Sequence, residues 1–214
     1  MEIHFDHLVI AARVLGEGVD WVERRLGVSM DAGGNHDLMG THNRILGLGP
    51  GRFLEVIAID PQAPAPERPR WFELDTPAMH ARLERGPALI HWAARTDDIE
   101  AAVAATWSPP LPDILPLVRG NFRWKITVPA DGSLPHAGVA PTIIQWFTRH
   151  PSEVARDAGC RLEALVLNHP GAPALLHALR YAGLAAAEPV QAHHQDAGLV
   201  ARIRTPKGMV ELRE

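Results

Sequence analysis

Apolar and polar positions alternate at the start of the chain. The stretch "FDHLVIAA", residues 5–12, reads as a half-buried β-strand, because side chains two positions apart in a strand point to the same face. On this pattern His7 shares a face with Ile3, Phe5 and Val9. A strand usually carries a β-branched or aromatic residue at such a position. His7 is therefore either a core histidine with a hydrogen-bond partner or part of a site.

The residues that follow complete a small unit. Residues 16–26 carry apolar side chains at near-helical intervals and end at Gly27, which predicts an amphipathic helix. "THNRILGLG" and "RFLEVIAID" are two apolar runs joined by turn residues, which predicts paired antiparallel strands. With a short strand expected near residues 28–32, residues 1–60 form a βαβββ unit. Its last strand carries Glu55 on an otherwise apolar face.

The same order of elements recurs in the middle of the chain. Residues 61–86 read as a proline-rich linker followed by a helix that starts at Thr76 and Pro77. Residues 87–150 then repeat the unit, with the strands "ALIHWAART", "NFRWKITVP" and "PTIIQWFT". The helix between the first two of these strands has Asp97 as its expected N-cap.

A third, partial unit is expected over residues 151–214. It contains the strand "RLEALVLNH", a helix over about residues 173–182 and two strands joined by a turn at Pro206. Polar residues at matching strand positions have similar separations, 48, 54 and 48 positions: His7 and Glu55, His91 and Gln145, Glu163 and Glu211. Self-similarity of this kind indicates units that pair with one another, because a small sheet with one helix cannot bury both of its faces.

These patterns predict an α+β fold of repeated βαβββ units, paired into a half-open sheet cup with helices outside. The alternative is a chance agreement among common strand patterns. In such a cup the side chains of His7, Glu55, His91 and Gln145 converge.

Composition excludes several other classes of function. The 214 residues are 46% hydrophobic and 21% charged, with a formal net charge of −4 and no basic stripe for a nucleic-acid backbone. No run of eighteen apolar residues suits a membrane span, and the N-terminus does not have the pattern of a signal peptide, so a cytoplasmic protein is expected. The single cysteine, Cys160, has no partner for an internal disulfide.

Four motifs resemble those of a known protein family: "FDHLVIAA", "RFLEVIAID", "LIHWAART" and the ending "TPKGMVEL". With these motifs the chain resembles the vicinal-oxygen-chelate superfamily, which contains glyoxalase I, extradiol dioxygenases and fosfomycin-resistance proteins. "GGNHDLMGTHNRILGLGPGRFLEVIAID" and "APTIIQWF" are similar to its glyoxalase-like domain branch. The resemblance covers essentially the whole chain and implies one glyoxalase-like domain.

The resemblance also implies a ligand set for a divalent metal ion such as Fe, Mn, Zn or Ni. The positions that match the metal ligands of the superfamily are His7, Glu55, His91 and Gln145. Gln145 departs from the pattern, because the last position usually carries a carboxylate and a neutral amide is a poorer ligand.

Two further stretches supply candidate substrate-binding residues. "GGNHDLMGTHN" is either a hydrophilic surface turn or a binding loop, and the resemblance favours a loop at the rim of the cup. His36, Thr41 and Asn43 are its candidates, and His36 is also a candidate for proton transfer.

In "LVRGNFRWKI", Arg119, Asn121 and Arg123 share one face by alternation and Phe122 and Trp124 the other. The polar face belongs either to a solvated edge strand or to the cup. In the cup, Arg119 or Arg123 would hold a substrate carboxylate, and Trp124 is a further binding candidate. The pair His193 and His194 is expected in a solvent-exposed loop or edge segment.

Two functions fit these residues. The first is a metal-dependent lyase, isomerase or dioxygenase that acts on a small molecule with adjacent oxygens. The second is a metal-free binding or resistance protein that uses the same cup, and six tryptophans against one tyrosine suit it. The partner in both cases is a small molecule. The third unit has an uncovered sheet edge or face, which predicts a homodimer.

Overall fold

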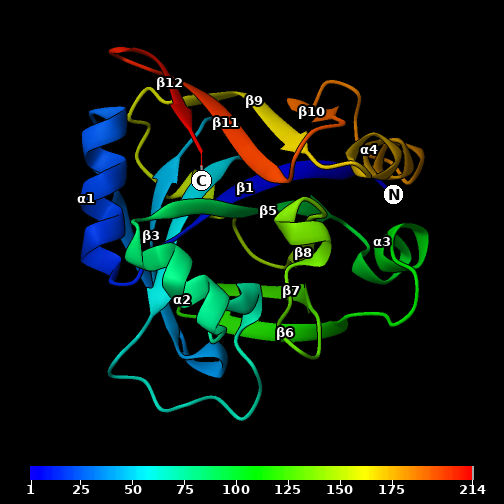
Figure 1. Ribbon diagram of the computed structural model, residues 1–214, viewed down its shortest axis with the longest axis horizontal. Coiled ribbons are helices and arrows are strands. Elements are labelled where there is room, and N and C mark those ends of the chain that lie inside the picture. The colour runs from blue at the N-terminus through cyan, green and yellow to red at the C-terminus, as the bar shows by residue number, and fades with distance from the viewer. Residues whose placement is uncertain (214) are drawn as a thin grey trace.

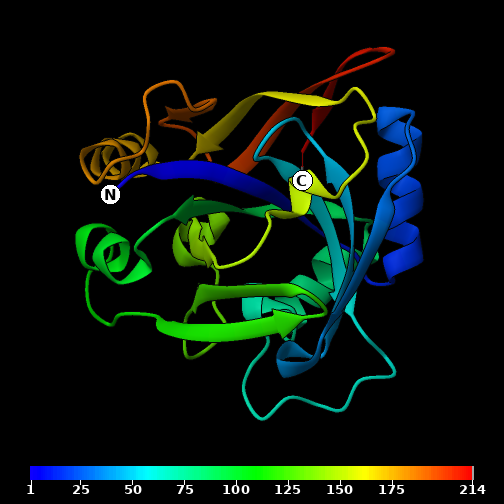
Figure 2. The ribbon, with the colours of Figure 1, turned by 180° about the vertical axis from the view of Figure 1, so that it is seen from behind.

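The computed structural model describes residues 1–213, and its main element is a curled sheet of eight strands (Figures 1 and 2). The strands lie in the order β2-β3-β4-β1-β5-β8-β7-β6. Their bounds are β1 (Ile3–Ala11), β2 (Asp31–His36), β3 (Thr41–Gly47), β4 (Phe53–Ile59), β5 (Ala88–Thr96), β6 (Asp113–Arg119), β7 (Phe122–Val128) and β8 (Thr142–Trp146).

The two halves of this sheet have the same arrangement of strands. At its centre β1 and β5 run antiparallel, while each pairs in parallel on its other side, β1 with β4 and β5 with β8. The remaining strands continue outward as antiparallel hairpins. The sheet bends into a half-barrel, which confirms the predicted α+β fold with a sheet cup.

Three helices accompany the two halves: α1 (Leu15–Leu26), α2 (Pro77–Glu84) and α3 (Ile99–Thr106). Thr76 caps α2, accepting a hydrogen bond from the backbone N–H of Met79 as the sequence predicts. The cap of α3 is Asp98 rather than the expected Asp97, because it is Asp98 that accepts the bond from the N–H of Ala101 at 3.0 Å. Within the described residues, no helix is both long and apolar enough to cross a membrane.

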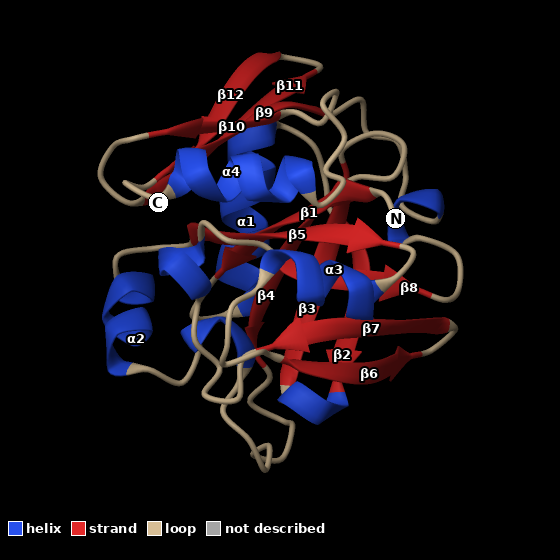
Figure 3. Ribbon diagram, turned by 90° about the vertical axis from the view of Figure 1, so that its right-hand side faces the viewer, coloured by secondary structure: helices blue, strands red, loops and turns tan. Residues whose placement is uncertain are grey.

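A second sheet of four strands stacks on the outside of the first (Figure 3). It has the order β10-β9-β11-β12, with β9 (Arg161–Asn168), β10 (Val190–His193), β11 (Gly198–Thr205) and β12 (Gly208–Leu212). Helix α4 (Ala172–Tyr181) packs against β10. Leu165, Leu179 and Ile203 of this part join Phe5 and Trp92 of the large sheet in one buried core. The third unit therefore covers the outer face of the cup.

The inner face has a core of its own, and an irregularity in β1 determines which residues reach it. A register shift between Phe5 and His7 interrupts the pairing of β1 with β5. Ile3 and Phe5 belong to the outer core, whereas Val9 belongs to the inner core. The expected common face of His7 with Ile3 and Phe5 is therefore wrong, because the bulge at Asp6 reverses the alternation and turns His7 inward with Val9.

Regular alternation also fails in the second half. β6 and β7 form a hairpin in which Arg119 pairs directly with Phe122 across the turn at Gly120 and Asn121. Directly paired residues share a face, so Arg119 lies on the side of Phe122 and Trp124. The expected polar face that joined Arg119 to Arg123 is wrong, because the chain reverses at Gly120 and Asn121 and the alternation of one strand does not continue into the next.

The stretch "GGNH" is part of β2 rather than a loop, so β2 begins later than the expected strand near residues 28–32. It pairs with β3, with a register shift between Ala32 and Asn35. A side chain on Gly33 would collide with the backbone oxygen of Asn43, 2.1 Å from the position of its Cβ. Glycine at this position allows the two strands to approach closely.

Candidate functional site

The half-barrel holds a small cavity of about 30 Å³ on its inner side, which we call the cup cavity. The aromatic side chains of Phe53, Trp71, Phe72, Trp124 and Trp146 line it. Trp71 and Phe72 belong to the short 3₁₀ turn η2 (Trp71–Glu73), which follows the long segment after β4. The polar side chains that reach the cavity are His7, His36, Asn43, Glu55 and Arg119.

His7 is held from behind by a buried carboxylate. Its Nδ1 lies 2.6 Å from Oδ1 of Asp6, which is fully buried. Burial alone would raise the pKa of Asp6, but hydrogen bonds from His150 and His7 outweigh it and hold the pKa well below its usual range. Asp6 is therefore ionised and can only accept, so the proton of neutral His7 is placed on Nδ1 and the lone pair on Nε2.

Two other donors fix Asp6 in place. Its Oδ2 accepts from Nε2 of His150 at 2.9 Å and from Nε1 of Trp146 at 3.1 Å. His150 accepts the backbone N–H of Ser152 at its other nitrogen, Nδ1, so its proton also has one position. The buried charge of Asp6 is thus compensated by three N–H groups.

The free nitrogen of His7 faces Glu55. The distance from His7 Nε2 to Glu55 Oε2 is 3.8 Å, too long for a hydrogen bond. Asn43 donates a short hydrogen bond to the other carboxylate oxygen of Glu55. Glu55 is only 6% exposed, so an imidazole nitrogen and a carboxylate lie side by side in a place almost closed to water.

His36 lies on the opposite side of Glu55, inside the cup rather than at its rim. Its Nδ1 bonds to Oγ1 of Thr41 at 3.1 Å, and its Nε2 lies 3.3 Å from a guanidinium nitrogen of Arg119. Burial lowers the pKa of His36 to about 4, with the charge of Arg119 acting in the same direction. At neutral pH His36 is uncharged and serves as an acceptor for Arg119.

Arg119 brings the positive charge of the site. One of its nitrogens donates to Oδ1 of Asn43 at 2.8 Å, and Asn43 Oδ1 also accepts the backbone N–H of Gly34. Its guanidinium has five N–H donors, so this bond uses only one of them, and Arg119 lines the cavity. The predicted binding residues His36, Thr41, Asn43, Arg119 and Trp124 are therefore brought together by the fold.

His91 is placed differently from the other members of the predicted ligand set. It is fully buried beside Phe72, with Nδ1 bonded to the backbone oxygen of Gly138 at 2.9 Å. Its Nε2 accepts the backbone N–H of Thr142 at 3.1 Å. Burial lowers the pKa of His91 to about 4. Both ring nitrogens are thus occupied, and His91 does not line the cup cavity.

Gln145 also serves another part of the structure. Its Oε1 accepts the backbone N–H of Ile99 and its Nε2 donates to the backbone oxygen of Asp97, so it anchors the start of α3. Of the four residues implied as metal ligands, the structure brings only His7 and Glu55 together. Across residues 1–213, no three His, Cys, Asp or Glu side chains are arranged to hold a metal ion.

The remaining candidates lie outside the cavity. Arg123 is exposed on the other face of β7, and His193 and His194 are exposed at the end of β10, as the sequence predicts for that pair. Sequence reasoning did not identify Asp6 or His150. The signal available for Asp6 was its position next to His7, but neighbours in a regular strand point to opposite faces, and only the bulge brings the two side chains together.

Comparisons with known proteins identify the family of the chain. The family model of the glyoxalase-like domain matches residues 5–183. No curated protein matches the chain. A solved structure of a hypothetical protein from Staphylococcus aureus is similar in fold, with a TM-score of 0.57 at 12% identity over 100% of this chain and 85% of that one.

Methylmalonyl-CoA epimerases are also among the similar structures. The enzyme from Mycobacterium tuberculosis has 17% identity and a TM-score of 0.42, covering 67% of this chain and 86% of its own. An epimerase solved with methylmalonyl-CoA and NH4+ has 15% identity and a TM-score of 0.43, covering 68% and 94%. On the family match over most of its length, the chain belongs to the glyoxalase-like domain family of the vicinal-oxygen-chelate superfamily.

Proposed function

We propose that the protein is a small-molecule enzyme that transfers a proton at a carbon next to a carbonyl group, with His7 as the base. One observation supports this most strongly: His7 is bonded through Nδ1 to the ionised Asp6 at 2.6 Å, while Nε2 opens on the cup cavity. A base held in one tautomer by a third group is the arrangement that general base catalysis requires.

The neighbouring residues suit the charge that develops in such a reaction. As the C–H proton moves to Nε2 of His7, its electron pair moves onto the carbonyl oxygen and forms an enolate. Arg119 supplies a positive charge and free donors for this oxygen and for an adjacent oxygen of the substrate. Asp6 stabilises the imidazolium of His7 until the proton returns to carbon or to oxygen.

An unpartnered donor in the cavity wall supports a ligand rich in oxygen. Within the described residues, Nε1 of Trp71 is buried and has no hydrogen-bond partner. Buried N–H groups normally have an acceptor. A substrate oxygen would satisfy this group, and Trp71 lines the cavity together with Arg119 and Glu55.

The turn η2 controls access to the cup cavity in this proposal. The cavity of about 30 Å³ has room for only one or two water molecules. Phe72 and Glu73, next to Trp71, both have left-handed backbone angles, with φ of 61° and 58°. Such strain is common in segments with a functional role. Displacement of the Trp71–Phe72 pair enlarges the cavity enough for a small substrate.

A divalent metal ion does not fit the implied set of ligands. Both ring nitrogens of His91 and both the amide oxygen and the amide nitrogen of Gln145 already make hydrogen bonds, so only His7 and Glu55 remain as ligands. Elemental analysis after incubation with Fe(II), Mn(II), Zn(II) and Ni(II) measures this directly, and one bound ion per chain that is lost in a His91→Ala variant would contradict the placement of His91.

A second candidate function is binding without chemistry. The five aromatic side chains around the cavity favour it, because they would enclose an apolar or aromatic compound. The enzymatic function requires the Asp6–His7 pair, whereas a protein that only binds an apolar compound does not need it.

Exchange of substrate protons with solvent distinguishes the two. The protein is incubated in D2O with hydroxyacetone, dihydroxyacetone, pyruvate and 2-hydroxyacids, and incorporation of deuterium next to the carbonyl is followed by ¹H NMR. We expect exchange of at least one compound, lost at least a hundredfold in His7→Gln, because general base catalysis contributes about 10²–10⁴. The exposed His177→Gln serves as the matched control. Absence of exchange for every compound leaves the binding function in place of the enzyme.

We also propose a homodimer. Strand β12 is an edge of the second sheet, and Met209 on it is 57% exposed. Pairing of two such edges would cover both the free backbone groups and this side chain.

A further inference from the structure

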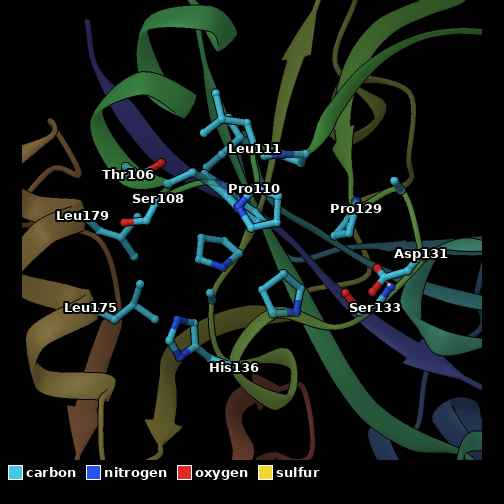
Figure 4. A pocket seen from close by; sticks show the side chains of 17 residues that line it. Thr106, Ser108, Pro110, Leu111, Pro129, Asp131, Ser133, His136, Leu175 and Leu179 are labelled. Atoms are coloured by element: carbon cyan, nitrogen blue, oxygen red, sulfur yellow. Dashed lines mark hydrogen bonds between the residues drawn. The ribbon is translucent and has the colours of Figure 1, made fainter.

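A cleft much larger than the cup cavity lies on the outer side of the large sheet. Its volume is about 540 Å³, in the range of small-molecule sites. Three segments that are far apart in the sequence form it: the loop between α3 and β6, the segment between β7 and β8, and helix α4 of the third unit (Figure 4). We call it the α3–α4 cleft.

The α3–α4 cleft is separate from the cup cavity. Ile143 of β8 lines the cleft and belongs to the outer core, while its neighbour Ile144 lines the cup cavity and belongs to the inner core. Neighbouring side chains of a strand point to opposite faces. The two sites therefore lie back to back across one strand.

Much of the lining of the cleft is apolar. Six side chains give it this character: Trp107, Pro110, Pro129, Pro135, Leu175 and Leu179. Figure 4 shows Leu175 and Leu179 on the α4 side, with proline rings between them and the opposite end. Rigid rings of this kind offer flat contact surfaces, which suit a planar aromatic group.

The opposite end of the cleft is acidic. Asp131 and Ser133 lie there, across from the two leucines (Figure 4). Hydrogen bonds from the backbone and side chain of Ser133 lower the pKa of Asp131, so its carboxylate is ionised. The residues that line the cleft include no lysine or arginine, and their only other titratable side chain is that of His136.

One wall is held in a strained shape. His136 and Ala137 both have left-handed backbone angles, with φ of 51° and 55°. The turn is fixed to β5, because Nδ1 of His91 donates to the oxygen of Gly138 and Nε1 of Trp92 donates to the oxygen of Val139 at 2.8 Å. A wall fixed in advance reduces the loss of entropy on binding.

We propose that the α3–α4 cleft is a second small-molecule site, and that its ligand is a planar aromatic ring carrying a cationic group. The ring lies among the prolines and leucines, and the cation faces Asp131. This proposal does not rest on the function of the cup, and it gives the third unit a role, because α4 supplies one of the walls.

Calorimetric titration of the full chain with three related probes tests the proposal. The probes are 1-naphthylmethylamine, which is a cation at pH 7, the neutral 1-naphthylmethanol, and the anion 1-naphthoate. We expect the amine to bind most tightly and the anion least. Asp131→Asn is expected to weaken binding of the amine about twofold to fivefold, the range for one exposed ion pair, and to leave the alcohol unchanged.

Variants locate the binding. Ala130 is exposed at the cleft, so Ala130→Trp fills it without disturbing the core and is expected to weaken all binding at least tenfold. Asp20→Asn on α1 removes an equal charge elsewhere and is expected to change nothing, as is His7→Ala in the cup. The proposal is overturned if the amine does not bind, if the anion binds as well as the amine, or if Ala130→Trp has no effect. It is also overturned if Ala130→Trp converts a dimer to a monomer, since a second chain would then occupy the cleft.

Discussion

Replacement of His91 by glutamine tests whether this residue is a buried neutral group or an open ligand. Burial lowers its pKa from 6.5 to about 4 in the folded protein. Between these values the unfolded chain binds the proton and the folded chain does not, so the free energy of unfolding rises with pH across this window. His91 thus costs nothing above pH 6.5 and destabilises the fold increasingly as the pH falls toward 4.

The size of this effect follows from the two pKa values. Each unit of pKa difference corresponds to about 1.4 kcal/mol, so the full loss approaches about 3 kcal/mol near pH 4. Between pH 7 and pH 5 the same relation gives about 2 kcal/mol. The His91→Gln variant lacks this proton and loses less stability over that interval by the same amount, although it starts lower at pH 7 because a buried hydrogen bond is disturbed.

Urea unfolding at pH 7, 6 and 5 measures the difference. We expect the free energy of unfolding of the wild type to fall about 2 kcal/mol further than that of His91→Gln, while the exposed His177→Gln follows the wild type. If His91→Gln and the wild type show the same dependence on pH, burial does not hold His91 neutral, and the argument against it as a ligand fails.

Three other changes have definite outcomes. Asp6→Asn should lower the free energy of unfolding by about 1–3 kcal/mol in urea titrations, because one amide cannot accept from all three donors; an unchanged midpoint would contradict the hydrogen bonds described. Gly138→Ala should lower the melting temperature measured by calorimetry by several degrees, since its Cβ would lie 2.2 Å from the oxygen of Ile90 at a φ of 86°. A melting temperature that does not fall would mean that the turn is free to move. Light scattering at micromolar concentration should give twice the monomer mass of 23.4 kDa, and a monomeric mass refutes the pairing through β12.

Much of the fold follows from patterns in the sequence, because the strands have clear alternation and strong turn residues between them. The hairpin of β3 and β4 and the capping of α2 by Thr76 agree with the sequence prediction. Periodicity also indicated the pairing of two similar halves, since β1, which carries His7, and β5, which carries His91, are the strands through which the halves pair.

The positions of the site residues were harder to predict from the sequence, because they depend on departures from regular strands. The bulge in β1 brings Asp6 behind His7, and the turn at Gly120 places Arg119 inside the cup. Alternation assumes an unbroken strand and assigns both residues to the wrong partners. His91 and Gln145 occupy the expected strands, but their hydrogen bonds to distant backbone groups depend on the loops of the second half, which no local pattern specifies.

The central claim is that neutral His7 keeps its proton on Nδ1, toward Asp6, and presents a free Nε2 to the cavity. Long-range ¹H–¹⁵N NMR of the imidazole groups, with His7 assigned by its loss in His7→Gln, reports the tautomer directly. We expect the neutral form of His7 to show a protonated Nδ1 and an unprotonated Nε2, and Asp6→Asn to abolish this preference. A neutral His7 with its proton on Nε2, or a preference that survives in Asp6→Asn, would contradict the account.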